Sequence, residues 1–220
     1  MAGLFITMEG IEGSGKSTQI RRLAARLTRL GIPVEVSKEP GGTPLCRELR
    51  QLLLEPHPSG ETWCAKSELL LFYADRAQHL AQSVLPALEE GRMVLLDRFD
   101  DSTRAYQGAQ GISDAVLDRI ADLVLGRVRP NMTIVLDMDP AASLGRVEAR
   151  NSAAGDFRET RFDNEHLAFH QRVRARFLAI AQKEPHRVVV VPAQDGPDAV
   201  EEAIWARLTP LLRTAGLPVE

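Results

Sequence analysis

Short apolar runs alternate with longer segments of helical spacing along the whole chain. The apolar runs predict five strands, at residues 4–9, 34–37, 93–97, 132–137 and 188–191. In the segments between them, apolar residues recur every three or four positions, which is typical of helices that bury one face. These helices are predicted at residues 19–30, 44–54, 67–90, 113–125, 140–150, 164–184 and 198–213, with a break near Pro86.

Strands that alternate with helices predict an α/β fold, with a five-stranded parallel sheet between two layers of helices. Residues 98–112 form a polar stretch to which we assign no element, and residues 151–160 are polar and contain glycine, so we expect a loop there. In such a fold ligands bind beyond the carboxyl ends of the strands. Glu39, Asp97 and Arg98 lie at or just after predicted strand ends, so we expect them at one crevice.

A glycine-rich loop follows the first predicted strand and leads into a helix. Gly10-x4-Gly15-Lys16-Ser17 fits the P-loop pattern, in which backbone N–H groups and a helix N-terminus surround phosphates. Lys16 would reach the β- and γ-phosphates, and the Ser17 hydroxyl would bind Mg²⁺. The rival interpretation, a turn without a ligand, fits the strand and helix on either side less well. The predicted ATP-binding residues are Gly10, Ile11, Glu12, Gly13, Ser14, Gly15, Lys16, Ser17 and Thr18.

Composition narrows the class of protein. A chain of 220 residues, 44% hydrophobic and 26% charged, is typical of one globular domain. The net charge of −3 gives no indication of nucleic acid or anionic membrane as a partner. Two cysteines are too few for a disulfide framework, and no apolar run approaches the roughly 20 residues of a membrane span. The chain enters a strand directly, without a basic segment and cleavage site, so we expect a cytoplasmic enzyme.

Arginines are placed where phosphoryl transfer would need them. A P-loop alone does not separate kinases from motors, switches or transporters. Transfer between two phosphorylated molecules needs cations around the transferred group, because positioning and electrostatics do most of the work. Arg98 follows a strand end, and Arg150, Arg158 and Arg161 surround the polar loop. A solvated basic surface is the alternative, and it fits Arg98 least well.

Four segments together resemble bacterial thymidylate kinases over nearly the whole chain. They are Glu9-Gly-x-x-Gly-x-Gly-Lys-Ser-Thr18, Glu39-Pro-Gly-Gly-Thr43, Leu71-Phe72-x-x-Asp75-Arg76-x-Gln78-His79, and Asp97-Arg98-Phe99-x-Asp101-Ser102-x-x-Ala105-Tyr106-Gln107-Gly108. The resemblance implies a three-layer P-loop NTPase fold in one domain, 1–220, with a lid at about 150–161. It also implies a homodimer that phosphorylates dTMP to dTDP with ATP and Mg²⁺, in dTTP biosynthesis.

The resemblance also implies a dTMP site. Phe72 would stack on thymine, Arg76 would bind its carbonyl edge, and Tyr106 would disfavour a 2′-hydroxyl. Arg98 and Arg50 would hold the acceptor phosphate. The residues implied for dTMP are Glu39, Pro40, Arg50, Phe72, Arg76, Arg98, Ser102, Thr103, Tyr106 and Gln107. Spacing supports part of this, since Phe72 and Arg76 share one helix face.

Catalytic roles follow from the same resemblance. Glu12 would address the sugar 3′-hydroxyl and the metal region, and together with Ser17 it is a candidate Mg²⁺ ligand. Family members with an acidic residue at this place carry catalytic arginines in the lid, here Arg158 and Arg161, with Arg150 the weaker candidate. The implied catalytic residues are Glu12, Lys16, Arg98, Arg158 and Arg161. The chain departs from the family pattern at Lys38, where arginine is more frequent, and in a longer lid with fewer arginines.

Several residues have plainer interpretations. Phe72 is also a candidate core residue. His166 and His170, four apart, lack the glutamate of a His-Glu-x-x-His zinc site, so we interpret them as a solvated helix face. Asp139, before Pro140, predicts a helix N-cap rather than a metal ligand. Surplus leucines at 69–71, 80 and 85 fit either a dimer contact or the core.

Two rival functions remain at this stage. The nearest is another small P-loop kinase with a different acceptor. The second is a nucleotide-dependent switch that binds a protein partner, which would leave Phe72, Arg76 and the Asp97-Arg98 pair without a role.

Overall fold

Five parallel strands form one sheet at the centre of the molecule. The computed structural model describes residues 3–154 and 166–219, with the backbone alone for 150–154. The sheet order is β2-β3-β1-β4-β5, and all neighbouring pairs are parallel. The strands are β1 (Phe5–Glu9), β2 (Val34–Lys38), β3 (Met93–Asp97), β4 (Met132–Asp137) and β5 (Val188–Pro192). All five predicted strands are therefore confirmed.

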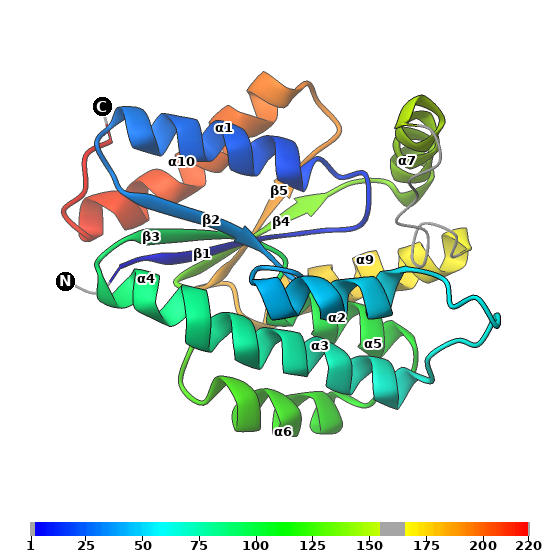
Figure 1. Ribbon diagram of the computed structural model, residues 1–220. Coiled ribbons are helices and arrows are strands. Elements are labelled where there is room, and N and C mark those ends of the chain that lie inside the picture. The colour runs from blue at the N-terminus through cyan, green and yellow to red at the C-terminus, as the bar shows by residue number, and fades with distance from the viewer. Residues whose placement is uncertain (1–2, 155–165, 220) are drawn as a thin grey trace.

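Helices cover both faces of this sheet (Figure 1). The helices before β3 are α1 (Lys16–Arg29), α2 (Pro44–Leu54), α3 (Ala65–His79) and α4 (Leu85–Glu89). Those after β3 are α5 (Asp100–Ala109), α6 (Asp114–Leu125), α7 (Pro140–Ala154), α9 (Leu167–Lys183) and α10 (Pro197–Thr214). α1 and α10 cover one face, and the others lie mostly on the opposite side (Figure 1). This arrangement confirms the predicted three-layer α/β fold.

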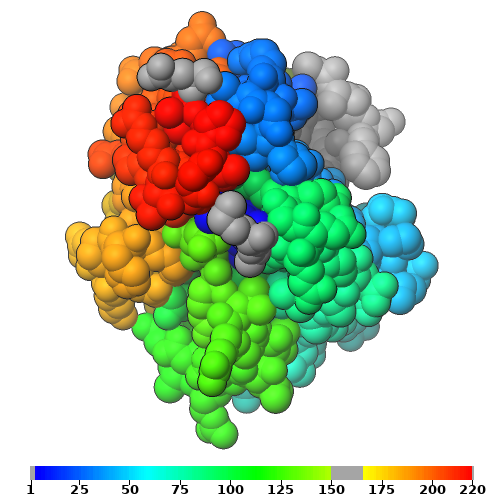
Figure 2. Space-filling view, turned by 90° about the vertical axis from the view of Figure 1, so that its left-hand side faces the viewer, coloured from blue at the N-terminus to red at the C-terminus, as the bar shows by residue number. Residues whose placement is uncertain are grey.

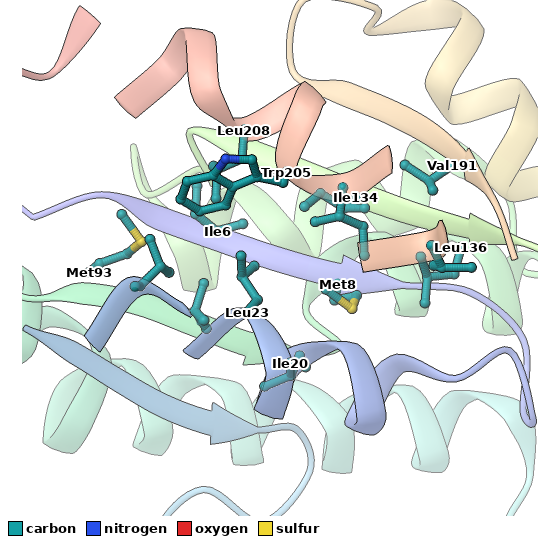
Figure 3. Close-up of a cluster of buried hydrophobic side chains, with 14 of the residues drawn as sticks. Ile6, Met8, Ile20, Leu23, Met93, Ile134, Leu136, Val191, Trp205 and Leu208 are labelled. Carbon is teal, nitrogen blue, oxygen red and sulfur yellow. The ribbon is translucent and has the colours of Figure 1, made fainter. Parts of the chain in front are cut away.

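Side chains alternate between two cores because successive residues of a strand point to opposite faces. Ile6 and Met8 of β1 enter the core beneath α1 and α10, which Trp205 and Leu208 complete (Figure 3). Phe5 points the other way, into the core beneath α3, α4 and α6. A third cluster lies between β4, α5 and α9. The inner strands β1, β3 and β4 are thus largely buried on both faces, which explains their apolar sequences, whereas the edge strand β2 is partly exposed and mixes polar with apolar residues.

Three helical segments differ from the prediction. The segment expected at 67–90 is interrupted by a π-helical turn, Leu80–Val84, which lies directly before the turn that contains Pro86. Proline lacks an N–H and its ring clashes with the carbonyl four residues earlier, so a wider turn accommodates it. The polar stretch after Asp97, to which no element was assigned, contains α5, and α7 continues through residue 154, beyond the predicted end at 150. α5 lacks an apolar pattern because its buried face is largely polar, and Asp100 and Asp101 favour its N-terminus.

The strands all end at the same edge of the sheet, on the right-hand side of Figure 1. The loops after β1, β2, β3 and β5 therefore gather there. Figure 2 views the opposite end, with the red C-terminal residues beside the start of the chain. Within the described ranges, no helix is both long enough and apolar enough to cross a membrane.

Candidate active site

A cavity of about 790 Å³ lies at the carboxyl edge of the sheet. It is lined by residues 12–19 of the glycine-rich loop and by residues from the loops after β2, β3 and β5. From the predicted sites the lining includes Glu12, Gly13, Ser14, Gly15, Lys16, Ser17, Thr18, Glu39, Pro40, Arg50, Phe72, Arg76, Arg98, Ser102, Thr103, Tyr106 and Gln107. Gly10 and Ile11 are buried behind it, where their carbonyls face Lys16. The tertiary structure thus brings the described candidate residues to one place.

The glycine-rich loop has a backbone that needs its glycines. Gly13 and Gly15 adopt φ values of 74° and 96°, in the left-handed region that side chains disfavour. A Cβ on Gly13 would also lie 2.5 Å from the Ser143 carbonyl oxygen. Gly15 is the residue directly before α1, so the N–H groups of the first helical turn open toward the cavity. The loop is therefore shaped as an anion site at a helix N-terminus.

Lys16 is held inside this loop. Its Nζ donates to the carbonyl oxygens of Gly10 (3.1 Å) and Ile11 (2.9 Å). Burial, followed by the nearby charge of Arg98, lowers its pKa to about 8, although Asp97, Glu12 and Glu9 oppose the change. A bound phosphate would restore the favourable environment of the ammonium group, since an opposite charge stabilises it.

Ser17 faces the end of β3. Its Oγ donates to Asp97 Oδ2 at 2.8 Å, and both residues line the cavity. A P-loop hydroxyl beside a carboxylate at a strand end is the arrangement that holds Mg²⁺ in P-loop enzymes. Asp97 was predicted to lie at the crevice but was not assigned to a metal. Within the described part of the chain, no three His, Cys, Asp or Glu residues form a metal cage.

Arg98 turns back over the glycine-rich loop. Among the described residues other than glycine, Arg98 alone has a positive φ, 69°. Its Nη1 donates to the Gly10 carbonyl (3.1 Å), and its Nη2 donates to Glu12 Oε1 (2.8 Å) and the Tyr106 hydroxyl (3.2 Å). The side chain is 19% exposed and lines the cavity. A fixed cation therefore faces the phosphate loop from the opposite wall.

Glu12 lies at the centre of a second group of contacts. Its carboxylate accepts hydrogen bonds from Arg98 and from the Tyr106 hydroxyl (2.7 Å), and His170 Nδ1 lies 3.6 Å away. Burial raises its pKa, but Arg98 and Lys16 outweigh burial, so the pKa is lower than its ordinary value. Glu12 is thus held as an anion between the glycine-rich loop, α5 and α9.

Arg76 forms a buried network at the other wall of the cavity. Its Nε donates to Glu39 Oε2 (2.8 Å), and its Nη1 donates to Thr103 Oγ1 (3.1 Å) and Asp100 Oδ1 (3.4 Å). The Arg76 side chain is only 2% exposed, and Tyr73 donates to the same Asp100 oxygen. Arg76 also lines the cavity. The network therefore fixes the direction of one guanidinium group.

The loop that carries Glu39 is fastened to α3. The Gly41 N–H donates to Asp75 Oδ1 (2.9 Å), while His79 bridges Glu39 Oε1 (3.1 Å) and Ser37 Oγ (2.8 Å). A Cβ on Gly42 would lie 2.2 Å from His79 Nε2, so only glycine fits beside that ring. Burial, with the Glu39 charge, raises the pKa of Asp75 to about 6. Asp75 and His79 thus hold the loop that carries Glu39.

The remaining predicted residues lie along the same walls. Gln107 donates to Glu68 at 2.9 Å, and Arg50 donates to the Pro40 carbonyl at 2.8 Å. Phe72 is half-buried; it packs against the cluster beneath α5 and α9 and also lines the cavity. Arg158 and Arg161 lie outside the described residues, as does the side chain of Arg150.

Several residues at the cavity were not predicted. Arg146 of α7 and residues 193–197, which follow β5, line the far part of the cavity. For residues 193–197 the only signal in the sequence was their place after a predicted strand. His170 is a correction. We expected a solvated face, but its ring is 1% exposed against Phe169 and beside Glu12, because α9 packs on α5. Asp139 does cap α7, since its Oδ1 accepts the N–H groups of Ala141 and Ala142.

The geometry has a clear chemical consequence. An anion site on the glycine-rich loop faces a second region, which contains the Phe72 ring and the guanidinium groups of Arg50 and Arg76. Arg98 lies between these regions, and it contacts Glu12 of one and Ser102 of the other. The cavity is therefore suited to bring two anionic molecules together over positive groups.

Comparison with known proteins agrees with this geometry. The family model for thymidylate kinase matches residues 8–204. The chain is 47% identical to a thymidylate kinase of Pseudomonas fluorescens over 216 residues, which cover 98% of this chain and 99% of that protein. It is 45% identical to a thymidylate kinase of Syntrophotalea carbinolica over 213 residues, 96% of this chain and 98% of that protein. A crystal structure of thymidylate kinase from Ehrlichia chaffeensis, 34% identical, superposes with a TM-score of 0.76 over 95% of this chain and 100% of that one. The chain belongs to the thymidylate kinase family.

Proposed function

We propose that this chain transfers the γ-phosphoryl group of ATP to dTMP, which yields ADP and dTDP, a step in dTTP biosynthesis. The observation that carries the proposal is a single cavity in which the glycine-rich loop and a second group of arginines, Arg50 and Arg76, line the walls, with Arg98 held against the loop. Family membership gives the acceptor its identity. Residues 1–220 would act as one kinase unit.

ATP would occupy the part of the cavity formed by residues 12–19 and 193–197. The N–H groups of the glycine-rich loop and Lys16 would surround its phosphates. Lys16 would exchange its contacts with the Gly10 and Ile11 carbonyls for phosphate oxygens. The Arg146 guanidinium lies 3.4 Å from the Gln194 carbonyl oxygen, where its planar face would pack on the adenine. The predicted lid residues Arg158 and Arg161 would close over the triphosphate.

Mg²⁺ would bind at Ser17 and Asp97. The Ser17 hydroxyl and the Asp97 carboxylate supply oxygen ligands of the kind that Mg²⁺ prefers, and they meet at the cavity wall. Glu12 fits this role less well, because Arg98 and Tyr106 already hold its two carboxylate oxygens. When bound, the ion would neutralise charge on the β- and γ-phosphates.

dTMP would occupy the part of the cavity between α3 and α5. Phe72 would stack on the thymine, and Arg76 would direct its Nη2 donors at a carbonyl oxygen of the base. Thr103 and Gln107 would complete the contacts to the base, and Pro40 would line the pocket. Glu12 and Tyr106 would address the deoxyribose. Arg98 and Arg50 would hold the acceptor phosphate, which is already ionised and needs no strong base.

The chain's own residues would then lower the barrier mainly by positioning. Lys16 and Arg98 approach the transferred group from opposite sides and would stabilise its charge in the transition state. Closure over the cavity would exclude water, so that dTMP rather than water accepts the phosphoryl group.

A coupled assay for ADP release tests the proposal. We expect turnover with dTMP well above turnover with dUMP, dCMP, GMP or shikimate. Turnover of another acceptor at a higher kcat/KM than dTMP would reject the assignment. Slow hydrolysis without any acceptor dependence would instead favour a nucleotide-dependent switch.

A homodimer would be formed through α2, α3 and α6. α3 contacts both α2 and α6, and the three helices expose Leu45, Leu52, Leu70, Val116 and Leu123 to between 49% and 83%. Exposed apolar side chains on adjoining helices favour association. Light scattering on the wild type should give twice the chain mass, and Leu70→Glu should give the single mass. A monomeric wild type at micromolar concentration would contradict the dimer.

We also propose that the enzyme works in the cytoplasm, where a nucleotide kinase meets ATP. Cys46 and Cys64 are both free thiols in the structure, as in proteins of reducing compartments. Cell fractionation with an antibody to the chain would test this location.

A further inference from the structure

Glu9 is a buried acid one residue before the glycine-rich loop, and neither the P-loop pattern nor the proposed substrates give it a role. Its side chain is fully buried at the end of β1 and does not line the cavity. It accepts one hydrogen bond from Phe99, between β3 and α5, and one from Ser102, in the first turn of α5. Burial of a carboxyl group costs free energy unless the group is hydrogen-bonded, so the role of Glu9 depends on these two contacts.

The first contact fixes an unusual turn. The Arg98 N–H still donates to the Met8 carbonyl, as in the β1–β3 ladder. The next N–H, of Phe99, donates instead to Glu9 Oε1 at 2.7 Å, so the side chain takes over where the ladder ends. Between these two bonds Arg98 adopts its φ of 69°. A left-handed conformation is unfavourable for a residue with a side chain, and it persists only where surrounding contacts impose it.

The second contact reaches the Arg98 side chain. The Ser102 hydroxyl donates to Glu9 Oε2 at 2.5 Å and accepts from Arg98 Nη1 at 3.0 Å. Glu9 therefore holds both the backbone turn after Arg98 and, through Ser102, the guanidinium itself. Arg98 Nη1 is also fixed by the Gly10 carbonyl, which is in the residue next to Glu9.

We propose that Glu9 is a positioning residue that holds Arg98 in the left-handed turn. In this turn the Arg98 guanidinium lies over the glycine-rich loop and faces the proposed site of the acceptor phosphate. This inference rests on the proposed function of the cavity. Glu9 would not touch substrate, and its effect would pass through the backbone of Phe99 and the hydroxyl of Ser102. Without it, Arg98 would relax to an ordinary conformation and swing out of the site.

The protonation of Glu9 decides which replacement is conservative. Burial, followed by the charge of Asp101, raises the pKa of Glu9 to about 8. A neutral glutamine of the same length still accepts the Phe99 N–H through its carbonyl oxygen. Aspartate keeps the carboxyl group but withdraws it by one methylene from both partners. Leucine fills the space and accepts no hydrogen bond.

The experiment compares Glu9→Gln, Glu9→Asp and Glu9→Leu in the wild type and in an Arg98→Ala background. Turnover of dTMP by the wild type tests the proposed function separately. We expect Glu9→Gln to stay within fivefold of wild-type kcat/KM for dTMP, whereas Glu9→Asp and Glu9→Leu lose about 100-fold, with KM for ATP within twofold. In the Arg98→Ala background the loss caused by Glu9→Leu should shrink to less than threefold, because the residue it positions is absent.

Thr7→Val is the matched control. Thr7 lies two residues before Glu9 on the same face of β1, and its Oγ1 shares a buried 2.8 Å hydrogen bond with Thr133 Oγ1. Thr7→Val should lower the melting temperature and leave kcat/KM for dTMP unchanged.

Two results would overturn the proposal: wild-type activity in a folded Glu9→Leu variant, or an undiminished loss in the Arg98→Ala background. If Glu9→Leu does not fold, Glu9→Asp takes its place in the cycle. Should that variant also fail, Ser102→Ala replaces it. A loss of equal size with and without Arg98 would again reject the role.

Discussion

The glycine-rich loop and the Arg76 network lie in one cavity but are built in different ways. The loop presents mainly backbone groups, and its conformation follows from glycines at 13 and 15 and from the helix that begins at Lys16. The Arg76 network consists of side chains from α3, α5 and the loop after β2. The hydrogen-bond partners of Arg76 lie 24 to 37 positions from it in sequence. An anion site can thus be encoded within ten residues, whereas a site for a base needs the assembled core.

The glycine-rich loop and the Arg76 network also differ in how substitutions change their stability. Backbone groups of the loop stay polar whatever side chains surround them, so the loop tolerates changes elsewhere. The Arg76 network buries three charged groups that depend on one another, and removal of one leaves the others unpaired. Substitutions in the loop should therefore affect chemistry, and substitutions in the network should affect both stability and binding.

The largest effect is expected from Lys16→Ala. It removes the cation of the loop while the glycine backbone keeps its shape, so kcat should fall by about 10³-fold or more. The melting temperature should change little, since Lys16 Nζ contacts only carbonyl groups of its own loop. A coupled assay measures the fall in kcat, and calorimetry measures the melting temperature. Lys66→Ala, at an exposed position of α3, is the control, and near-normal turnover by Lys16→Ala would refute the role.

Arg76→Met should be the clearest test of the network. Glu39 and Asp100 would remain buried without their cation, so the free energy of unfolding should fall by about 3–5 kcal/mol. Urea unfolding measures this loss, and titration calorimetry should show weaker dTMP binding with ATP binding unchanged.

The companion variant is Arg76→Met with Glu39→Gln. It should regain part of the stability, because one unpaired charge is removed, but none of the dTMP affinity. Equal stability of the single and double variants would show that Arg76 and Glu39 are not coupled.

Tyr106 tests how side chains on the acceptor side of the cavity set specificity. Its ring packs edge-on against Phe169 and Phe177, and its hydroxyl contacts Glu12 and Arg98. Tyr106→Ala should relax discrimination between dTMP and its ribose analogue by about 30-fold, a change of roughly 2 kcal/mol. Tyr106→Phe keeps the ring and should keep the discrimination. The measurement is the ratio of kcat/KM for dTMP to kcat/KM for its ribose analogue. An unchanged ratio in Tyr106→Ala would show that Tyr106 does not disfavour the 2′-hydroxyl.

The smallest change is expected in the contribution of Glu9 to stability between pH 6 and pH 7, about 1.4 kcal/mol. Its pKa is raised from 4.5 to about 8 in the folded chain, so the folded state binds the proton more tightly than the unfolded state does. The wild type should therefore lose stability relative to Glu9→Gln as the pH rises from 4.5 to 8, by about 1.4 kcal/mol for each unit in mid-range. Urea unfolding of both chains at pH 6 and 7 measures the slope. Parallel stability curves would show that Glu9 does not titrate in this range.

Local sequence predicted every strand and most helices, since each depends on a period of apolar residues that is visible within one segment. It failed at α5, because a helix whose buried face is mostly Asp, Ser, Thr and Gln shows no apolar period. It also failed at His170, where helical spacing could not reveal that the ring lies against Phe169 and near Glu12. Both errors concern polar residues whose burial depends on a distant partner.

By itself the sequence determined the alternation of strands and helices, the phosphate loop and the set of motifs that places the chain in its family. These are local or compositional properties, fixed by periodicity, glycine conformation and residue type. Only the tertiary structure decided that Asp97 meets Ser17, that Glu9 holds the turn at Arg98, and that Arg76 joins Glu39 to Asp100. Such contacts join residues up to 90 positions apart. Their geometry is set by the order and register of strands in the sheet, which no single segment contains.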